Sequence, residues 1–517
     1  MMAIINLCQG QFLIPRISVR GLRGAPRGHW KPAEPLQLDQ NPIEASELDQ
    51  PIAKDILNHP VENKIKSYRT YRQKIKQLKN NCSSKLVNEE NQFELVKNAV
   101  TMLHDIPYSE QLIMKQNKHN EFIERLRQFK TVRNQISPDC ISDIVASPIQ
   151  ESYRNKDLMS TGLDIHGNLT VGFHVGGRKH GVVTVNPEPI KIIRDSHKLV
   201  AALYAQFLKS LPREHVSMYL GPREGWAKGN WSEIMIRSNY LEEMMINIEY
   251  YRNSQSNDFY EDEKARLIEK LLSCNLPISS IYITEVSVDK NDDDGIPLRE
   301  KRKIRIRQLI YGEEKLIDQI GDLKMSLGPG TFCQGNTTVA EIMLREVKQR
   351  IKFGRHKTLL DLGCGSGMFS LFFAPYYRGV IGVDVEDTTF AETNAKLNSI
   401  GNCKFVTAGV QVLLPRMLKE FRNQGAGVSG ILNPGRSGVP HNVINAIRGF
   451  PLINSLVYVS CKPEDERVMK NLVILMNHDH KSSSAPFTLS DSLPLDMFPH
   501  THHCEHVFVF TRKLKLT

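Results

Sequence analysis

The chain has 517 residues, of which 40% are hydrophobic and 24% charged, an ordinary composition for a globular protein of about two to four domains. It contains no run of about 18 apolar residues, which argues against a membrane-spanning helix. Its formal net charge of +10 favours a polyanionic partner such as RNA, because Lys and Arg displace the counterions of phosphates, although charge alone does not indicate the fold.

The first 60 residues are predicted to form a targeting segment and a linker. The first acidic residue of the chain is Glu34. It is preceded by four arginines: Arg16, Arg20, Arg23 and Arg27. An arginine-rich beginning without acids is typical of a mitochondrial presequence, so we expect the protein in the mitochondrial matrix. The alternative interpretation is a disordered basic tail that binds RNA.

Residues 61–148 are interpreted as a helical extension. Charged and apolar residues mix at helical spacing over residues 62–78, 94–103 and 108–129, which predicts amphipathic helices. Many of the charged residues are Lys and Arg, so this extension is a candidate to enlarge an RNA-binding surface.

Residues 149–337 are predicted to form a central α+β domain that contacts RNA. Strand-like alternation is seen at residues 169–173, 182–185, 233–237, 281–286 and 304–310. Helical patterns lie between these strands at residues 195–211 and 260–272, and residues 291–295 have the composition of a turn or loop, being rich in Asn, Asp and Gly.

Residues 338–517 are predicted to form a separate α/β domain. Short apolar strands are expected at residues 357–362, 380–383, 428–432, 456–460 and 507–510, with a helix through 394–398. Such alternation of strands and helices favours a parallel sheet covered by helices, which is a Rossmann-like architecture.

A glycine-rich loop follows the first of these strands, with the sequence Asp-Leu-Gly-Cys-Gly-Ser-Gly at 361–367. Gly363 and Gly365 allow a tight turn and the approach of a ligand to the peptide N–H groups. The order Gly-x-Gly-x-Gly differs from the nicotinamide fingerprint Gly-x-Gly-x-x-Gly. The loop resembles the first motif of class I S-adenosylmethionine methyltransferases. Asp384, at the end of the next strand, is the acid expected to bind the ribose hydroxyls.

Two further segments indicate the reaction. Ser-Cys-Lys-Pro at 460–463 puts Cys461 at the carboxyl end of an apolar strand, where open α/β sheets bind their ligands, and Phe-Pro-His-Thr-His-His-Cys-Glu at 498–505 precedes the last strand. With Phe-Cys-Gln-Gly-Asn at 332–336 and Tyr-Arg-Asn-Lys at 153–156, the chain resembles the RNA uracil-5-methyltransferase family. The resemblance covers roughly residues 105–512.

The resemblance implies that Cys461 is the nucleophile and Glu505 the base, with S-adenosylmethionine as the cofactor. Elementary chemistry agrees, because a thiolate that adds to C6 of uracil turns C5 into a nucleophile, and a carboxylate can then remove the C5 proton. The alternative is a buried strand-end cysteine and a solvent-facing acid. The resemblance also implies that Gln334, Asp384 and Asn433 bind the cofactor.

The chain departs from the family at Asn433, because Asn-Pro-Gly-Arg at 433–436 stands where the family usually has Asp-Pro-Pro-Arg. The substitution keeps a hydrogen-bond acceptor but loses a negative charge, which puts turnover in question. One rival hypothesis is therefore a catalytically reduced RNA-binding or chaperone protein. A second rival is a cytosine-5 RNA methyltransferase, although its cysteine motifs differ.

No metal site is expected. None of the nine cysteines forms a Cys-x-x-Cys pair, so a zinc ribbon or an iron–sulfur cluster lacks ligands, and free thiols in a reducing compartment fit better. The histidine cluster near the C-terminus does not match a standard zinc spacing; its members are His500, His502, His503 and His506.

A basic run at residues 301–307 is the candidate for phosphate contacts. In a strand Lys303, Arg305 and Arg307 share one face and Arg302 lies on the other; the alternative is a solvated surface strand. A target base must leave its stack to reach Cys461, so single-stranded loops are the expected substrate. On family grounds we expect the T-loop uridine of mitochondrial tRNA, with ribosomal RNA as the alternative.

Overall fold

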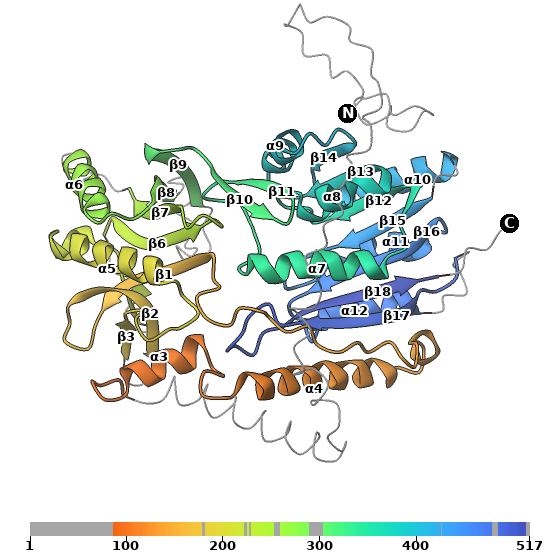
Figure 1. The fold of residues 1–517 in the computed structure, drawn as a ribbon, viewed down its shortest axis with the longest axis horizontal. Helices are drawn as coiled ribbons and strands as arrows, with labels where there is room; N and C mark the ends of the chain where they lie inside the picture. Colours follow the sequence, from red (N-terminus) through yellow and green to blue (C-terminus); the bar gives the residue numbers. More distant parts are fainter. Residues whose placement is uncertain are drawn as a thin grey trace, which may run out of the picture.

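The computed structural model describes residues 86–177, 181–221, 225–226, 229–252, 259–288, 303–424, 427–477 and 484–512. The predicted presequence, the predicted helix at 62–78 and the loop at 291–295 lie outside these residues. Two bodies, each with a seven-stranded sheet, lie side by side, and helix α4 (Tyr108–Arg127) runs beneath the second of them (Figure 1).

The first body is the α+β unit predicted from strand alternation. Its sheet has the order β3-β2-β1-β6-β7-β8-β9, and all neighbours except β7 and β8 pair antiparallel. The parallel pair β7–β8 is joined by a helical crossover through α6, as parallel neighbours require. The bounds are β1 Lys156–Leu163, β2 Leu169–Gly177, β3 Gly181–Val185, β6 Trp231–Ser238, β7 Met244–Tyr251, β8 Ile278–Val288, β9 Lys303–Gly312, α3 Gln92–Val100, α5 Asp195–Lys209 and α6 Tyr260–Leu272, with a two-stranded ribbon of β4 Tyr219–Gly221 and β5 Gly225–Trp226.

The second body contains the parallel sheet predicted for the C-terminal part. Its order is β14-β13-β12-β15-β16-β18-β17, in which the first five strands are parallel and β18 pairs antiparallel with both of its neighbours, β16 and β17. The first five follow the 3-2-1-4-5 order of doubly wound nucleotide-binding sheets. The bounds are β12 Gly354–Leu362, β13 Tyr377–Asp384, β14 Cys403–Thr407, β15 Val428–Leu432, β16 Ile453–Ser460, β17 Thr488–Leu495 and β18 Glu505–Thr511.

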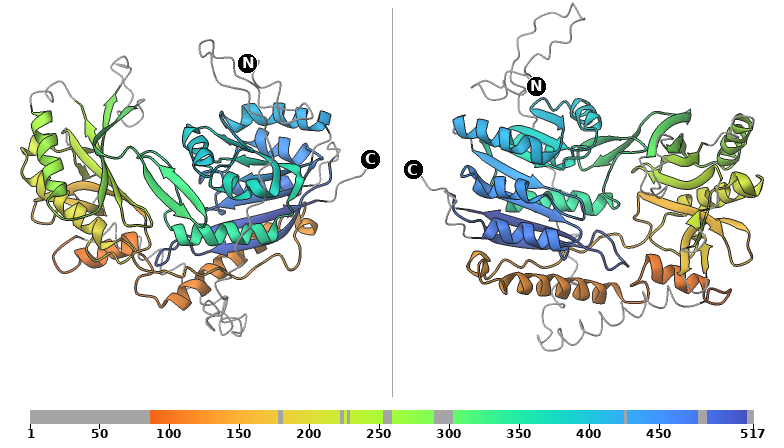
Figure 2. Two further views of the ribbon diagram at one scale, coloured as in Figure 1. Left: turned by 45° about the horizontal axis from the view of Figure 1, so that its top comes forward. Right: turned by 180° about the vertical axis from the view of Figure 1, so that it is seen from behind.

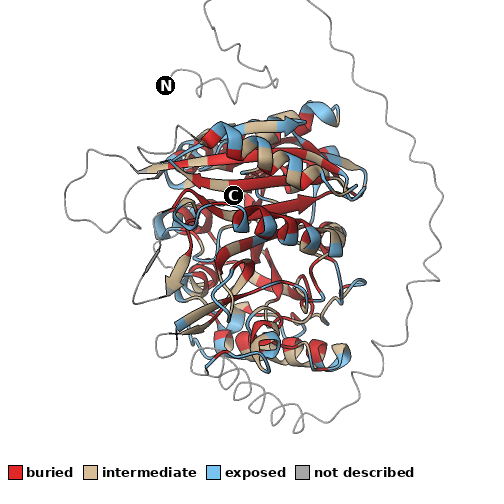
Figure 3. Cartoon of the chain, turned by 90° about the vertical axis from the view of Figure 1, so that its left-hand side faces the viewer, coloured by how far each residue is buried: buried red, intermediate tan, exposed pale blue. Residues whose placement is uncertain are grey.

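Helices cover both faces of this second sheet, so most residues of its inner strands are buried (Figure 3). Alternate residues of β16 enter two apolar layers, with Leu456 and Tyr458 on one face and Val457 and Val459 on the other, as the period of two requires. The first layer contains α4, α10 Val410–Gln424, α11 His441–Gly449 and α12 Glu466–Met476; the second contains α7 Thr337–Arg350, α8 Met368–Phe373 and α9 Thr389–Leu397. Short 3₁₀ helices lie at Arg133–Gln135, Arg213–His215 and Ala374–Tyr376.

A hairpin of β10 (Leu316–Ile320) and β11 (Leu323–Leu327) connects the two bodies, as two further views show (Figure 2). Its buried residues Met325 and Leu327 belong to the same apolar layer as Met343 of α7. The segment between the two sheets is therefore held against the second body by packing.

Helix α4 braces the loop that joins β17 to β18. Lys115 on this helix lies 2.5 Å from the Asp496 carboxylate, and both side chains are fully buried. The Lys115 ammonium group also donates to the carbonyl of Phe498 at 3.0 Å. Gln111, one turn earlier, accepts a hydrogen bond from the His500 backbone N–H at 2.9 Å. These bonds fix the backbone immediately before Glu505.

We predict that Lys115→Met destabilises the protein by about 3–5 kcal/mol, because it leaves the Asp496 carboxylate buried without its cation. The free energy of unfolding from a denaturant titration measures this loss. As the control, Lys470→Met removes an exposed ion pair with Glu466 and leaves the free energy almost unchanged. Equal effects of the two substitutions would contradict the bracing role of α4.

Candidate active site

The residues singled out in the sequence lie along one edge of the second sheet. The parallel strands β13, β12, β15 and β16 end there, and Asp384, Gly363, Asn433 and Cys461 stand at or directly after those ends. Strand β18 runs the other way, so it begins at the same edge with Glu505. Four parallel strands and one antiparallel strand thus bring side chains to one place, as doubly wound sheets do at their ligand sites.

The pairing of β16 with β18 brings the two predicted catalytic residues together. Ser460 pairs with His506 in this antiparallel register, so Cys461, directly after β16, and Glu505, the first residue of β18, occupy the next positions along the two chain segments. Residues directly opposite in an antiparallel pair have Cα atoms only about 4.5–5.5 Å apart and side chains on the same face. The thiol and the carboxyl therefore face one small volume.

Burial and neighbouring charges shift the pKa values of the Cys461 thiol and the Glu505 carboxyl. Glu505 is 5% exposed, and its burial raises the pKa of the carboxyl to about 8. Burial also raises the pKa of the Cys461 thiol, and the neighbouring Glu505 charge raises it further. A hydrogen bond and the positive charge of Arg436 act in the opposite direction, because both stabilise a thiolate.

Two residues of this site received no role from the sequence. Arg436 closes the Asn-Pro-Gly-Arg segment after β15, and its presence in that segment was the available signal. His503 lies two residues before Glu505, and burial lowers its pKa to about 4, so its imidazole is neutral at physiological pH. Neither position in the site is visible in sequence spacing, because both depend on the folded sheet edge.

The glycine loop has the backbone geometry that requires glycine. Gly363, Gly365 and Gly367 have positive φ values of 84°, 53° and 90°. A Cβ on Gly363 would lie 2.5 Å from the carbonyl oxygen of Asn433, whereas one on Gly365 would meet no atom within 4 Å. The backbone N–H of Gly365 donates to the Asp384 carboxylate at 2.8 Å. The loop is therefore packed on one side and open to a ligand on the other.

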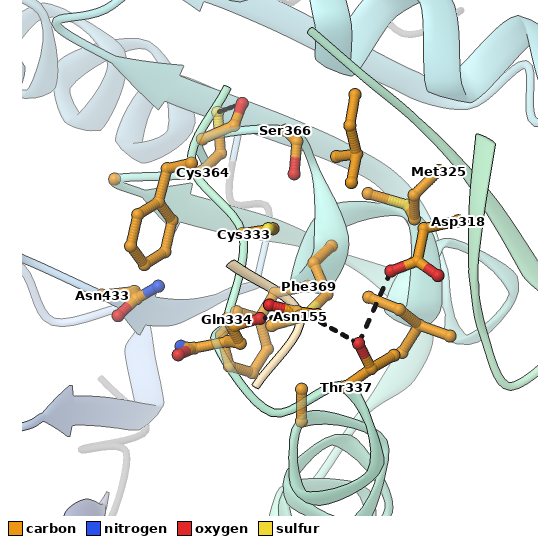
Figure 4. A pocket seen from close by; sticks show the side chains of 17 residues that line it. Asn155, Asp318, Met325, Cys333, Gln334, Thr337, Cys364, Ser366, Phe369 and Asn433 are labelled. Carbon is orange, nitrogen blue, oxygen red and sulfur yellow. Dashed lines mark hydrogen bonds between the residues drawn. The ribbon is translucent and has the colours of Figure 1, made fainter. Parts of the chain in front are cut away.

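A pocket lies between this loop, the hairpin and α7 (Figure 4). Gln334, Gly363, Gly365 and Asn433, four of the five residues predicted to bind a cofactor, line it, and its apolar wall includes Met325, Leu327 and Phe369. The fifth, Asp384, is not among the lining residues and instead holds the loop through Gly365. Mixed polar and apolar walls with exposed peptide groups fit a ligand that has nucleoside and amino-acid portions, such as S-adenosylmethionine.

The histidines near the C-terminus have separate partners. The His500 ring lies 3.0 Å from the Gln111 side chain, and the His506 ring stacks on His119. Within the described residues, no group of three or more His, Cys, Asp or Glu side chains is arranged to hold a metal ion. The same part of the chain contains no helix that is both long and apolar enough to cross a membrane.

The basic run is only partly described. Lys301 and Arg302 lie outside the described residues. Arg305 on β9 pairs with Glu249 at 2.8 Å, and the Arg307 guanidinium lies close beside Gly330, in the loop that leads to the pocket. Phosphate binding by this face stays a prediction.

Comparison with known proteins identifies the family of the chain. Residues 241–513 match the family described as tRNA (Uracil-5-)-methyltransferase. The chain is 31% identical over 444 residues to the Homo sapiens protein named tRNA (uracil-5-)-methyltransferase homolog B, which covers 81% of this chain and 84% of the human protein. The Danio rerio protein of the same name is 30% identical over 441 residues, 81% of this chain and 87% of the fish protein.

Among solved structures, the chain is similar to that of the Pyrococcus abyssi tRNA (uracil-54, C5)-methyltransferase in complex with S-adenosyl-L-homocysteine. The TM-score is 0.52 at 18% identity, and the match covers 79% of this chain and 85% of the archaeal chain. This likeness concerns the fold, and it agrees with the predicted Rossmann-like class I methyltransferase domain and the preceding α+β body.

We predict that Glu505→Gln lowers the pKa of the Cys461 thiol and that Arg436→Ala raises it. Glutamine removes a negative charge that opposes the thiolate, and alanine removes a positive charge that favours it. The measurement is the rate of Cys461 alkylation by iodoacetamide as a function of pH, followed by mass spectrometry of the peptide. The midpoint of the rate profile should move to lower pH in the first variant and to higher pH in the second. Shifts in the same direction would contradict the arrangement.

Proposed function

The chain belongs to the tRNA (uracil-5-)-methyltransferase family, and we propose that it methylates C5 of a uridine in RNA with S-adenosylmethionine as the methyl donor, using Cys461 as the nucleophile and Glu505 as the base. The observation that carries the proposal is that Cys461 and Glu505 stand directly beside the Ser460–His506 pair of β16 and β18, close enough for the Glu505 charge to act on the thiol, at the sheet edge that also bears the glycine-loop pocket.

The chemistry requires a nucleophile and a base on the same ring. The Cys461 sulfur forms a bond to C6 of uracil, and the C5–C6 π electrons move toward C5 and the C4 carbonyl. The cofactor, when bound, supplies an electrophilic methyl group for C5. Glu505 accepts the C5 proton, and the C6–S bond breaks to restore the C5–C6 double bond and the thiolate. A base with a pKa near 8 is well matched to proton transfer at a mildly alkaline pH.

Different residues of the site are proposed to make different contacts with the cofactor. Gln334, Gly363, Gly365 and Asn433 supply polar contacts along the pocket, and Asp384 fixes the loop through Gly365 and stands at the strand end where ribose hydroxyls are bound. Asn433 contributes an amide where an acid would add a negative charge. The backbone N–H of Asn433 donates to the carbonyl of Leu362 at 3.0 Å. This bond does not depend on the side chain, so it holds the loop after β15 on the sheet whether the residue is Asn or Asp.

The proposed substrate is the T-loop uridine of mitochondrial tRNA, with mitochondrial ribosomal RNA as the alternative. Two observations support this choice: the human and fish relatives are named as tRNA methyltransferases, and four arginines precede the first acid of the chain. The second is the ground for proposing the mitochondrial matrix as the location. The target base must be flipped out or single-stranded to meet the Cys461 sulfur.

We predict that RNA containing 5-fluorouridine traps the protein in a covalent complex when S-adenosylmethionine is present. Fluorine at C5 cannot be removed as a proton, so the C6–S bond persists. The adduct is measured as a band of retarded mobility in a denaturing gel. Cys461→Ala should abolish it. Cys274→Ala, which changes another free and partly exposed cysteine in the first body, should leave it intact.

The outcomes of this trapping experiment separate the rival functions. RNA binding without an adduct and without methyl transfer to unmodified uridine would favour a catalytically reduced RNA-binding protein. Methylation of cytidine in place of uridine would favour a cytosine-5 enzyme.

We further predict that cells without the protein lose 5-methyluridine from the T-loop of mitochondrial tRNA, while cytosolic tRNA keeps it. Sequencing of both RNA pools for this base measures the effect. Re-expression of the full chain should restore the base and Cys461→Ala should not. Loss of the base from mitochondrial ribosomal RNA alone would favour the alternative substrate, and loss from cytosolic RNA would contradict the mitochondrial location.

A further inference from the structure

Asn155 is a residue of the first body that lines the pocket of the second. It stands directly before β1 and is 3% exposed. Its backbone is held on both sides, because its N–H donates to the carbonyl of Gly335 at 3.2 Å and its carbonyl accepts from the N–H of Ser238 at 2.9 Å. Its side-chain nitrogen donates to the backbone oxygen of Gln334 at 2.8 Å and to the Thr337 hydroxyl at 2.7 Å. The side-chain oxygen is buried and has no hydrogen-bond partner.

The orientation of this amide follows from its neighbours. The Gln334 carbonyl can only accept, so it requires the nitrogen of the Asn155 amide. The Thr337 hydroxyl directs its own hydrogen toward the Asp318 carboxylate, 3.5 Å away, and so accepts from the same nitrogen. Rotating the amide by 180° would set two oxygens against each other. Figure 4 shows the resulting chain from Asn155 through Thr337 to Asp318 beside the pocket.

An unpartnered acceptor at this depth indicates a missing donor. Leaving a buried amide oxygen without a hydrogen bond costs about 1–3 kcal/mol, and such groups in folded proteins usually mark an absent ligand or water. Because the oxygen belongs to a pocket residue, a donor carried by the pocket ligand would satisfy it.

The surroundings select the kind of donor. Asp318, also 3% exposed, lines the same pocket and places an acidic group beside Asn155, which favours a cationic donor. On an S-adenosyl amino acid that donor is the α-ammonium group. The ribose hydroxyls are not the donor that we assign, because the acid expected to bind them is Asp384 at the end of β13. Asp384 is not among the residues that line this pocket.

We propose that the Asn155 side-chain oxygen accepts a hydrogen bond from the α-ammonium group of the cofactor, so that the first body completes the cofactor site and couples it to the position of Gln334. This assignment rests on the proposed function, because it presumes an S-adenosyl ligand.

The test compares two ligands that differ by one group. S-adenosylhomocysteine and its analogue without the α-amino group are titrated into the full chain by calorimetry, which measures binding without turnover. The wild-type protein should bind the amino-bearing ligand about tenfold more tightly or better, as expected for a hydrogen bond to a charged donor. In Asn155→Ala this preference should fall to about twofold or less.

Two further variants separate recognition from folding. Thr337→Val removes a partner of the Asn155 nitrogen but keeps the oxygen, and it should retain the preference even where both ligands bind more weakly. Asn155→Asp keeps an oxygen toward the pocket but sets its second oxygen against the Gln334 carbonyl, so both ligands should bind more weakly while the preference is retained. Loss of preference in either variant, or equal weakening of both ligands in Asn155→Ala, would overturn the proposal.

The result for the wild-type chain distinguishes this inference from the function on which it rests. A wild-type protein that binds neither ligand and forms no 5-fluorouridine adduct would overturn both. A wild-type protein that forms the adduct and binds both ligands with equal affinity would overturn only the role of Asn155.

Discussion

The active-site geometry depends on the register between β16 and β18. Cys461 and Glu505 are 44 positions apart in the numbering, and no local structure joins them. Because Ser460 pairs with His506, they become neighbours on adjacent strands. A shift of one residue would turn every side chain of β18 to the opposite face, and that strand is buried on both faces between two apolar layers. Packing of Phe508 and Phe510 on one face and Val507 and Val509 on the other thus enforces the alignment that the chemistry requires.

The same burial sets the electrostatic character of the site. Glu505 is removed from water, which makes its carboxyl a stronger base than an exposed glutamate. A carboxylate beside a thiolate is unfavourable, and Arg436 offsets part of that repulsion. The two anionic forms are needed at different stages, the thiolate for addition at C6 and the carboxylate for the later proton transfer. A site with one compensating cation can therefore serve both stages in turn.

The sequence predicted the architecture of the second body better than its edges. The inner parallel strands contain continuous apolar runs and were predicted from them. The edge strands β14 and β17 were not predicted, because β14 has a single buried residue and β17 contains Ser, Asp and Pro494, which edge strands tolerate. In the first body β7 was missed because its residues are almost all buried and show no alternation. The motifs identified Cys461, Glu505 and four pocket residues. The motifs also contain Asn155, Arg436 and His503 but gave them no role, since their surroundings join segments that only the folded chain brings together.

The bond between Lys115 and Asp496 joins residues separated by 381 positions in the sequence. During translation, helix α4 leaves the ribosome long before the strands that cover it, so Phe122 and Leu126, both buried in the finished protein, lack their native partners for most of synthesis. Such nascent segments are natural clients for chaperones that hold exposed apolar helices. Strand β18 also supplies Glu505, the proposed base, so a chain whose synthesis stops before this strand lacks the group that we propose removes the proton from C5.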